Sequence, residues 1–245
     1  MRMTPLCLIL QAMVTVKMFI RSKGAVSMAE DIILIGGGQH SGVVLYNMKE
    51  QGKYNAVGVL DSNPAKVGTE VHGKPVLGTY DAETLQKIRK KYKTNRFFIA
   101  FGAMRYRKAA YDFMVSQGWE AVNIIHPNAV VSPTAKIGKG VLIESGCLIT
   151  PSPVIGDNVV VNTGSQVNHD NVVENHVYIA SGVILSGGVT IGENTLLDDG
   201  VIVTLGHRVG KNSLVGAGSV VTKDIPDGVI CYGNPACVIR ENDKI

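Results

Sequence analysis

The sequence has few aromatic residues: they make up 6% of its 245 residues, and only one of them is Trp. It has no proline tract and no Gly-X-Y period, which excludes a collagen-like chain and a low-complexity linker. Wholesale disorder is also excluded, because 45% of the residues are hydrophobic and only 18% are charged. The chain is instead rich in glycine, with 28 residues. Glycine without aromatic residues predicts many tight turns around an aliphatic core.

Cysteine is also sparse, and its spacing argues against two kinds of site. Cys7, Cys147, Cys231 and Cys237 form no CxxC pair, so neither a disulfide framework nor a zinc cluster is expected. We therefore predict no metal cofactor, and a reducing, cytoplasmic location fits the cysteine usage best.

Long hydrophobic runs are missing as well. The best candidate, Pro5 to Val16, lies between Arg2 and Lys17 and resembles a short signal sequence, but it is too short to span a bilayer comfortably. Met28 directly precedes the first convincing strand, which favours a start assigned too far upstream. Residues 1–30 are thus predicted to be an extension, either a disordered tail or a misassigned start, and no membrane association is expected.

Charge is unevenly distributed, which suggests two modules. Residues 131–245 carry seven basic and eleven acidic residues, whereas the rest of the chain carries seventeen and nine. A basic module could bind a phosphorylated small molecule, a nucleic acid or a membrane surface. Because no basic stripe is interleaved with aromatic residues, nucleic acid is not an expected partner.

The first module begins like a nucleotide-binding unit. An apolar run at 32–35 enters the glycine-rich stretch GGGQHSG, and a helix-like segment follows. This order is that of a Rossmann-type unit, in which N–H groups of the helix N-terminus hold phosphate. The second strand, predicted at 56–60, ends in Asp61, whose carboxylate suits a ribose or a base. The glycines at 36, 38 and 42 miss the G-x-G-x-x-G spacing by one residue, which argues against an NAD(P) enzyme.

The remainder of this module alternates helix and strand. The segment AETLQKIRKKYK predicts a helix with one apolar face and a solvated basic face. The next strand, predicted at 97–101, leads to Gly102 and to a basic segment, Arg105–Lys108, that could reach a diphosphate. The alternation predicts a Rossmann-like α/β domain with a small parallel sheet over residues 31–125.

The second half of the chain has an internal period of six residues. Sixteen consecutive hexads each begin with an aliphatic residue, from Val131 through Ile137 and Ile143 to Val221. The third residue after the aliphatic one is Gly, Asn or Asp in thirteen hexads, and these residues tolerate left-handed backbone conformations. The fourth is mostly small or β-branched. With three hexads per coil of 18 residues, the pattern predicts a parallel β-helix over residues 126–245.

These motifs together resemble a known family. Preceded by GGGQHSG, LDSNP and FIAFGAMRYR, the repeat resembles the bacterial hexapeptide-repeat acetyltransferases of nucleotide sugars and sialic acid, including those making bacillosamine and perosamine derivatives. The resemblance runs from about Asp31 to Arg240. It implies an N-terminal Rossmann-like α/β domain followed by a left-handed parallel β-helix. It also implies acetyl-CoA as co-substrate and a homotrimer with active sites between subunits.

The histidines of the repeat differ in their phase. His169 is the second residue after an aliphatic one, at an outward corner, and its segment NTGSQVNHDNVV resembles the family's catalytic segment. The resemblance makes His169 the general base and Asp170 the carboxylate that orients it. By phase alone, His169 is an ordinary exposed turn residue, and Asp170 occupies the third position, where Gly, Asn or Asp recur because they tolerate a left-handed backbone conformation. His207 occupies the inward fourth position, so a core or packing role is expected for it rather than catalysis.

Gly187 lies 18 residues after His169, so the two share a corner one coil apart. Its backbone N–H is expected to stabilise the oxyanion. The resemblance further implies that CoA extends along the prism and contacts corner residues, for which the candidates are Tyr178, Gly187, Asp199 and Ala217. A close relative would have His in place of Tyr178. The segment YGNPACVI resembles the family's terminal cap beside the CoA nucleotide.

For the acceptor, the resemblance maps the nucleotide contacts onto the glycine loop and the ends of two strands, namely Gly38, Gln39, His40, Asp61, Ser62 and Gly102. The family often has a second acidic residue at the position of Ser62. Its absence here leaves the choice between uridine and guanosine open.

The predicted function is transfer of acetyl from acetyl-CoA to the 4-amino group of a nucleotide-linked amino-deoxysugar, by direct transfer with a histidine base. O-acetylation of sialic acid or another glycan precursor is an alternative, because the same base serves either acceptor. A β-helical carbonic anhydrase would need three converging histidines, and His169 and His207 differ in phase. A trimeric scaffold without catalysis is the non-enzymatic alternative.

Overall fold

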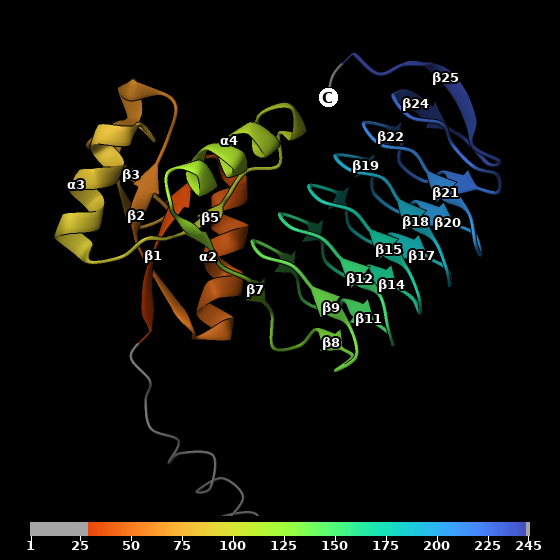
Figure 1. Cartoon of the computed structure of the whole chain (residues 1–245), viewed down its shortest axis with the longest axis horizontal. Coiled ribbons are helices and arrows are strands. Elements are labelled where there is room, and N and C mark those ends of the chain that lie inside the picture. The colour runs from red at the N-terminus through yellow and green to blue at the C-terminus, as the bar shows by residue number, and fades with distance from the viewer. Residues whose placement is uncertain (1–28, 244–245) are drawn as a thin grey trace, which may run out of the picture.

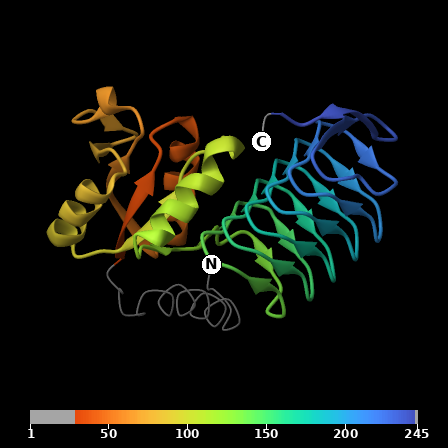
Figure 2. The same ribbon diagram turned by 45° about the horizontal axis from the view of Figure 1, so that its top comes forward.

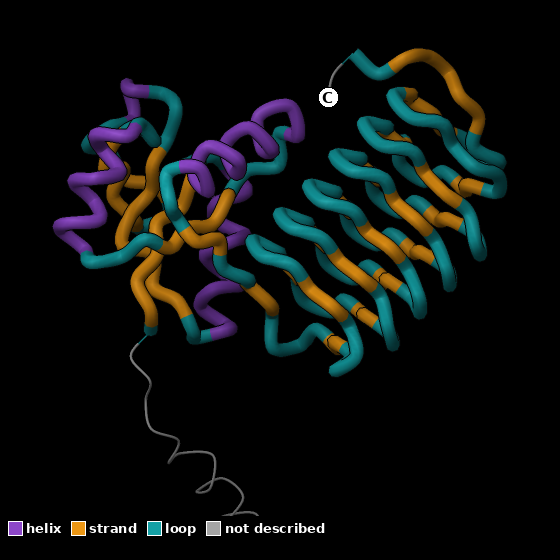
Figure 3. The backbone as a smooth tube through the Cα atoms, viewed as in Figure 1, coloured by secondary structure: helices purple, strands orange, loops and turns teal. Residues whose placement is uncertain are grey.

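The computed structural model describes residues 29–243 and divides them into an α/β domain and a prism of stacked coils (Figure 1). Figure 3 shows that the helices are confined to the first part, whereas the prism consists of short strands joined by corners. Most of the predicted extension, residues 1–28, lies outside the described range. Within that range, no helix has the length and apolar character needed to cross a membrane.

The α/β domain is a six-stranded sheet with helices on both faces. Ile32 and Leu34 of the first strand pack with the first helix, whereas Ile33 and Ile35 pack with the other two, as the alternation of a fully buried strand requires. In chain order the elements are β1 (Glu30–Ile35), α2 (Gln39–Gln51), β2 (Tyr54–Leu60), the 3-10 turn η1 (Pro64–Lys66), β3 (Glu70–Val71), β4 (Lys74–Gly78), α3 (Ala82–Tyr92), β5 (Arg96–Ile99), α4 (Met104–Ser116) and β6 (Glu120–Ala121).

The prediction of a wholly parallel sheet is wrong at one edge. The strand order is β3-β4-β2-β1-β5-β6, and β3 runs antiparallel to β4. The cause is the two-residue turn between them, in which both His72 and Gly73 have positive φ. Such a turn closes a tight hairpin and leaves no room for a crossover. The remaining pairs of the sheet are parallel, as expected.

The prism confirms the predicted parallel β-helix. Each strand from β7 to β23 has two residues, and each from β7 to β20 pairs in parallel with the strand 18 residues later, as Ile143 does with Val161. The last coil is shorter, since β22 pairs with β24 at a spacing of 16 residues. The strands are β7 (Ile124–Ile125), β8 (Val130–Val131), β9 (Lys136–Ile137), β10 (Leu142–Ile143), β11 (Leu148–Ile149), β12 (Val154–Ile155), β13 (Val160–Val161), β14 (Gln166–Val167), β15 (Val172–Val173), β16 (Tyr178–Ile179), β17 (Ile184–Leu185), β18 (Thr190–Ile191), β19 (Leu196–Leu197), β20 (Ile202–Val203), β21 (Arg208–Val209), β22 (Leu214–Val215), β23 (Val220–Val221), β24 (Val229–Tyr232) and β25 (Cys237–Glu241).

The strands form three sheets, which we name after one strand of the second coil. The β10 sheet has the order β25-β24-β22-β19-β16-β13-β10-β7, the β11 sheet β23-β20-β17-β14-β11-β8, and the β12 sheet β21-β18-β15-β12-β9. Successive sheets meet at three edges, which we call β10/β11, β11/β12 and β12/β10. Each edge is a stack of four-residue corners.

The phase of the hexad determines burial, as predicted. The aliphatic column from Ile143 to Val221 lies inside the prism, and the small residues at the fourth position, such as Ser165 and Thr195, are fully buried. At the third position the backbone has positive φ, for example 55° at Asn158 and 59° at Asp170. Asn and Asp adopt this conformation at lower cost than other non-glycine residues, which explains their recurrence there.

The α/β domain packs against the outer face of the β10 sheet (Figure 2). Val44 and Met48 of α2 belong to one buried cluster with Leu142 and Val160 of the prism. Helix α4 lies against the β12/β10 edge, where Lys108 and Glu193 form an ion pair of 3.1 Å. One flank of the prism is therefore covered by the same chain, and the β11 and β12 sheets are left uncovered by it.

Candidate active site

His169 and Asp170 lie at the β11/β12 edge, in the corner that follows β14. The Nδ1 atom of His169 is 2.9 Å from Oδ2 of Asp170, and the two side chains are 61% and 69% exposed. A carboxylate oxygen can only accept a hydrogen bond, so the nitrogen that faces it must carry a hydrogen. In the neutral ring this pairing places the hydrogen on Nδ1 and leaves Nε2 as the basic atom. The structure thus brings the predicted base and its orienting carboxylate together.

The imidazole of His169 lies against Gly187 of the next coil. A Cβ atom at residue 187 would overlap Cε1 and Nε2 of the ring and would lie 3.1 Å from Nδ1. The coils are also joined here by a hydrogen bond of 2.9 Å from the Gly188 N–H to the His169 carbonyl oxygen. Any side chain at position 187 would displace the His169 ring, so glycine is required there. The 18-residue spacing did not reveal this packing requirement.

The backbone N–H of Gly187 donates to no atom of the described residues. On the β12/β10 edge, several equivalent N–H groups are occupied: Lys139 donates to Asp157 Oδ1 at 2.7 Å, and Asp157 donates to Asn175 Oδ1 at 2.8 Å. The edge that carries His169 therefore keeps a free donor next to the base. This is the arrangement that an oxyanion requires.

Three of the six predicted nucleotide contacts, Gly38, Asp61 and Ser62, line a cavity of about 390 Å³ at the end of the glycine loop, whereas Gln39, His40 and Gly102 do not. It is lined by Gly36, Gly37, Gly38, Asp61, Ser62, Lys66, Tyr80, Phe101, Ala103 and Tyr106. Asp61 already has partners: Oδ2 accepts from Gly37 N–H at 2.8 Å and from Lys66 Nζ at 2.9 Å, and Oδ1 accepts from Asn63 N–H at 2.9 Å. Burial opposes ionisation, but these hydrogen bonds outweigh it and lower the pKa of Asp61. Sequence reasoning missed Lys66.

A second cavity, which we call the interdomain cavity, lies between α2 and the β10/β11 edge and measures about 510 Å³. Its walls are His40, Gly42, Val43, Tyr46 and Asn47 from the α2 side, and Glu144, Ser145, Asn162, Thr163 and Ser181 from the prism. Burial, with a contribution from the charge of Arg107, lowers the pKa of His40 to about 4. His40 is therefore neutral at pH 7. Of the lining residues, sequence reasoning had singled out only His40.

The remaining predicted site residues do not gather at one place. Tyr178 lies on strand β16 rather than at a corner, and its ring packs on Gly102, where an added Cβ would be 3.3 Å away. Asp199 and Ala217 are exposed on the β10/β11 edge, whereas Gly187 is on the β11/β12 edge. Gln39 is exposed at the start of α2. In one chain, the candidate CoA contacts are thus divided between two edges and one sheet face.

His207 does not lie in the core, but it has a packing contact. Its side chain is 33% exposed, and Nδ1 lies 3.2 Å from Oδ1 of Asp224, whose side chain is 70% exposed. This contact keeps the imidazole at the surface of the prism. Among residues 29–243, no group of three His, Cys, Asp or Glu side chains is placed to hold a metal ion.

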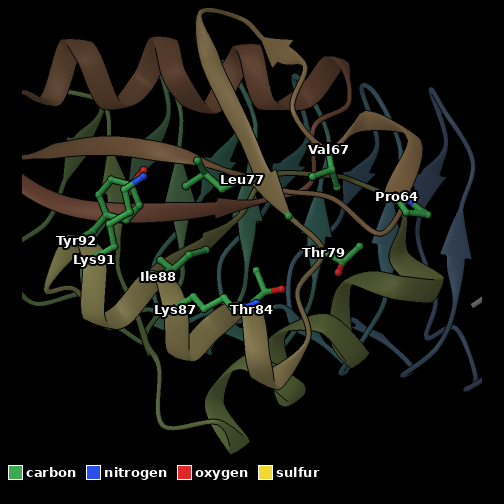
Figure 4. Close-up of a pocket in the computed structure, with 10 residues that line it drawn as sticks. Pro64, Val67, Leu77, Thr79, Thr84, Lys87, Ile88, Lys91 and Tyr92 are labelled. Carbon is green, nitrogen blue, oxygen red and sulfur yellow. The ribbon is translucent and has the colours of Figure 1, made fainter.

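Figure 4 shows a third cavity, of about 400 Å³, between α3 and the β4 edge of the sheet. Its apolar walls include Val67, Leu77 and Ile88, and Lys87 and Lys91 lie on α3 beside them. None of the predicted site residues lines this cavity. It belongs to the α/β domain alone.

Comparison with known proteins identifies the family. Residues 31–114 match the PglD N-terminal domain. The chain is 34% identical to a histidine-to-asparagine variant of perosamine N-acetyltransferase from Caulobacter crescentus, in complex with CoA and GDP-perosamine. The match covers 86% of this chain and 97% of that one, with a TM-score of 0.80. The chain belongs to the hexapeptide-repeat sugar acetyltransferases.

Two further solved structures support this assignment. The acetyltransferase domain of PglB from Neisseria gonorrhoeae FA1090, in complex with acetyl coenzyme A, is 31% identical, with 86% of this chain and all of that chain covered and a TM-score of 0.77. WeeI from Acinetobacter baumannii AYE is 25% identical with the same coverage and TM-score. No curated protein sequence matches the chain. The predicted left-handed β-helix and the class of acetyl-CoA-dependent sugar acetyltransferase are confirmed.

Proposed function

We propose that this acetyltransferase transfers the acetyl group of acetyl-CoA to the 4-amino group of a nucleotide-linked amino-deoxysugar, with His169 as general base. The observation that carries the proposal is the pairing of His169 with Asp170 directly over Gly187, whose N–H is free. Base, orienting carboxylate and oxyanion donor are the three groups that direct acyl transfer requires.

The reaction follows from these positions. The sugar amine attacks the thioester carbon, and Nε2 of His169 takes the proton that the nitrogen loses. Asp170 stabilises the imidazolium through Nδ1, and the Gly187 N–H donates to the developing oxyanion. When the C–S bond breaks, His169 returns the proton to the CoA sulfur. Typical contributions are about 10²–10⁴-fold for the base and about 10²–10³-fold for one oxyanion donor.

The division of the site between two edges supports a homotrimer as part of this proposal. The outer face of the β11 sheet is formed by Val130, Leu148, Gln166, Ile184, Ile202 and Val220, of which only one is polar. The corresponding face of the β12 sheet has the charged residues Lys136 and Arg208. Three prisms packed around an axis through their β11 sheets would bring the β11/β12 edge of one copy against the β10/β11 edge of the next.

This packing unites the two groups of candidate residues. His169 and Gly187 of one copy would face Asp199, Ala217 and the interdomain cavity of its neighbour. An extended CoA would then lie in the groove between copies, and backbone groups of both edges would bind it. Sedimentation should give a mass of three chains. An active monomer would contradict the arrangement.

The acceptor nucleotide is assigned to the cavity of about 390 Å³ in the α/β domain. Its glycine loop precedes the N-terminus of α2, where free N–H groups and the helix dipole favour a diphosphate. Tyr80, Phe101 and Tyr106 offer aromatic surface for a base. In the perosamine enzyme, two histidine variants were crystallised with both CoA and GDP-perosamine, so both ligands bind without that histidine. Such behaviour is expected when the removed histidine is a base rather than a binding group.

The test is release of the CoA thiol against UDP- and GDP-linked 4-amino sugars, with sialic acid in the same panel. His169→Ala should reduce kcat by about 10²–10⁴-fold while CoA binding is retained. Unchanged turnover would refute the role of His169. A response to sialic acid alone would replace the proposed acceptor.

A further inference from the structure

Glu144 is a buried carboxylate without a cation partner. It follows strand β10 at the β10/β11 edge, is 5% exposed, and lines the interdomain cavity. Its Oε2 accepts a hydrogen bond of 2.6 Å from the Thr163 hydroxyl, and its buried Oε1 has no partner. No Lys, Arg or His of the described residues forms an ion pair with it. Burying an unpaired carboxylate is costly, so a missing partner is indicated.

Two amides of the same cavity also carry an unpaired acceptor, and Nε2 of His40, which can donate or accept, is unpaired there as well. Asn162 donates from Nδ2 to the Tyr178 hydroxyl at 3.2 Å, and Asn47 donates from Nδ2 to the Val43 carbonyl at 2.9 Å. The Oδ1 atom of each amide is buried and has no partner. Each amide already donates one hydrogen bond, and Glu144, Asn162 and Asn47 thus contribute three buried acceptor oxygens without a partner to the walls of one cavity.

The chemistry of these acceptors selects the missing group. A hydroxyl brings one donor, whereas an amine brings two and an ammonium three. A carboxylate forms a charge-assisted hydrogen bond with either group, but only the nitrogen group, in its protonated form, adds an opposite charge. His40, which closes the cavity on the α2 side, is neutral at pH 7 and does not repel a cation. An amine therefore satisfies this cavity better than a hydroxyl does.

We propose that Glu144 is a specificity-determining residue that accepts N–H hydrogen bonds from the acceptor amine, so that the enzyme selects amino sugars over their hydroxyl counterparts. This inference rests on the proposed function and narrows its acceptor. The amine loses one proton to His169 of a neighbouring copy as the C–N bond forms and the C–S bond breaks. A second N–H remains on the nitrogen, and Glu144 holds that one throughout.

The test variant is Glu144→Gln, which keeps the shape of the side chain and the acceptor for Thr163 but removes the charge. Its control is Glu174→Gln. Glu174 has the same phase in the repeat but lies on the β12/β10 edge, where Oε2 accepts from Glu193 N–H at 2.8 Å. The probes are a GDP- or UDP-linked 4-amino-6-deoxysugar as substrate and its 4-hydroxy counterpart as competitive inhibitor.

Glu144→Gln should raise KM for the amino sugar by about 10- to 100-fold, as expected for loss of a charged hydrogen bond. The inhibition constant of the hydroxy sugar should change less than about twofold, as should KM for acetyl-CoA, and Glu174→Gln should change none of them. An unchanged KM for the amine, or an equal loss for the hydroxy sugar, would overturn the role of Glu144. If the wild-type enzyme releases no thiol with any nucleotide-linked amino sugar, the proposed function itself fails.

Discussion

Two edges of the same prism differ in whether the backbone N–H at the second position of the hexad is hydrogen-bonded. On the β12/β10 edge, the N–H groups of Lys139 and Asp157 are each bonded by a side chain of the next coil. On the β11/β12 edge, the N–H of Gly187 has no such partner among the described residues. The histidines follow the same division, since the side chain of His176 is 6% exposed and that of His169 is 61% exposed. The N–H groups of the β12/β10 edge thus contribute to stability, and we call this the closed edge. The Gly187 N–H on the β11/β12 edge is free to bind a ligand, and we call this the open edge.

The largest effect is expected from closing the open edge. Gly187→Ala should displace the His169 ring and disturb the adjacent N–H, lowering kcat by about 10²–10³-fold or more. The midpoint of thermal unfolding should change little, because the ring can swing into solvent. Steady-state thiol release and a melting curve on the same preparation check both statements. Full activity in this variant would show that the base does not work from its observed position.

Asp170→Asn should have the next largest effect. Asn tolerates the positive φ of 59° at this corner, so the fold should be unchanged. The amide no longer stabilises the imidazolium, and kcat should fall by about 10- to 100-fold, a moderate loss because water competes at so exposed a pair. The pH profile of kcat should shift together with the loss. A loss that appears only in KM would assign Asp170 to binding instead.

On the closed edge, the expected effect is on stability alone. Asn175→Ala removes the acceptor of the Asp157 N–H and should lower the free energy of unfolding by about 1 kcal/mol. It should leave thiol release intact, because this edge takes no part in the proposed site. Urea unfolding and an activity assay together make the comparison. A drop in kcat without a drop in stability would show that the two edges are not divided in this way.

The smallest effect concerns His176 and pH. Burial, followed by the charge of Lys108, lowers the pKa of His176 below its ordinary value of 6.5. The unfolded chain therefore binds a proton more readily than the folded one, so stability should fall as pH falls below about 6.5. His176→Asn should reduce this slope, and Asn already occupies the equivalent corner at 158 and 194. Urea unfolding at pH 7 and pH 5 measures the difference, and identical slopes would exclude His176 as a source.

Much of the fold could be predicted because the hexad ties sequence to space directly. From Ile143 to Val221, each aliphatic residue is inside, and pairing occurs at the expected spacing of 18 residues. The prediction was wrong where local geometry overrode the pattern. The His72–Gly73 turn reversed a strand, and His207 contacts the exposed Asp224 instead of filling an inward position.

The site was predictable only where its parts share an edge. The spacing between His169 and Gly187 placed them together, and the structure agrees. Glu144 and Lys66 were missed because their surroundings come from segments distant in sequence. Glu144 becomes significant only when α2 covers the β10/β11 edge, and Lys66 only when η1 brings it to Asp61 and the glycine loop. Periodicity carries no information about such tertiary contacts.

The strict 18-residue coil restricts how this enzyme can change in length. Inserting or deleting one hexad between His169 and Gly187 would carry every later residue to a different edge, and the Gly187 N–H would then lie far from the His169 ring. A whole coil inserted between them would keep each later side chain on its face but would separate the two residues along the prism axis. If the proposed roles hold, length variation compatible with catalysis is confined to the tips of corners, or to whole coils added beyond this pair. Homologous chains of different length should therefore differ by whole coils at the ends of the prism, with this pair of adjacent coils kept intact.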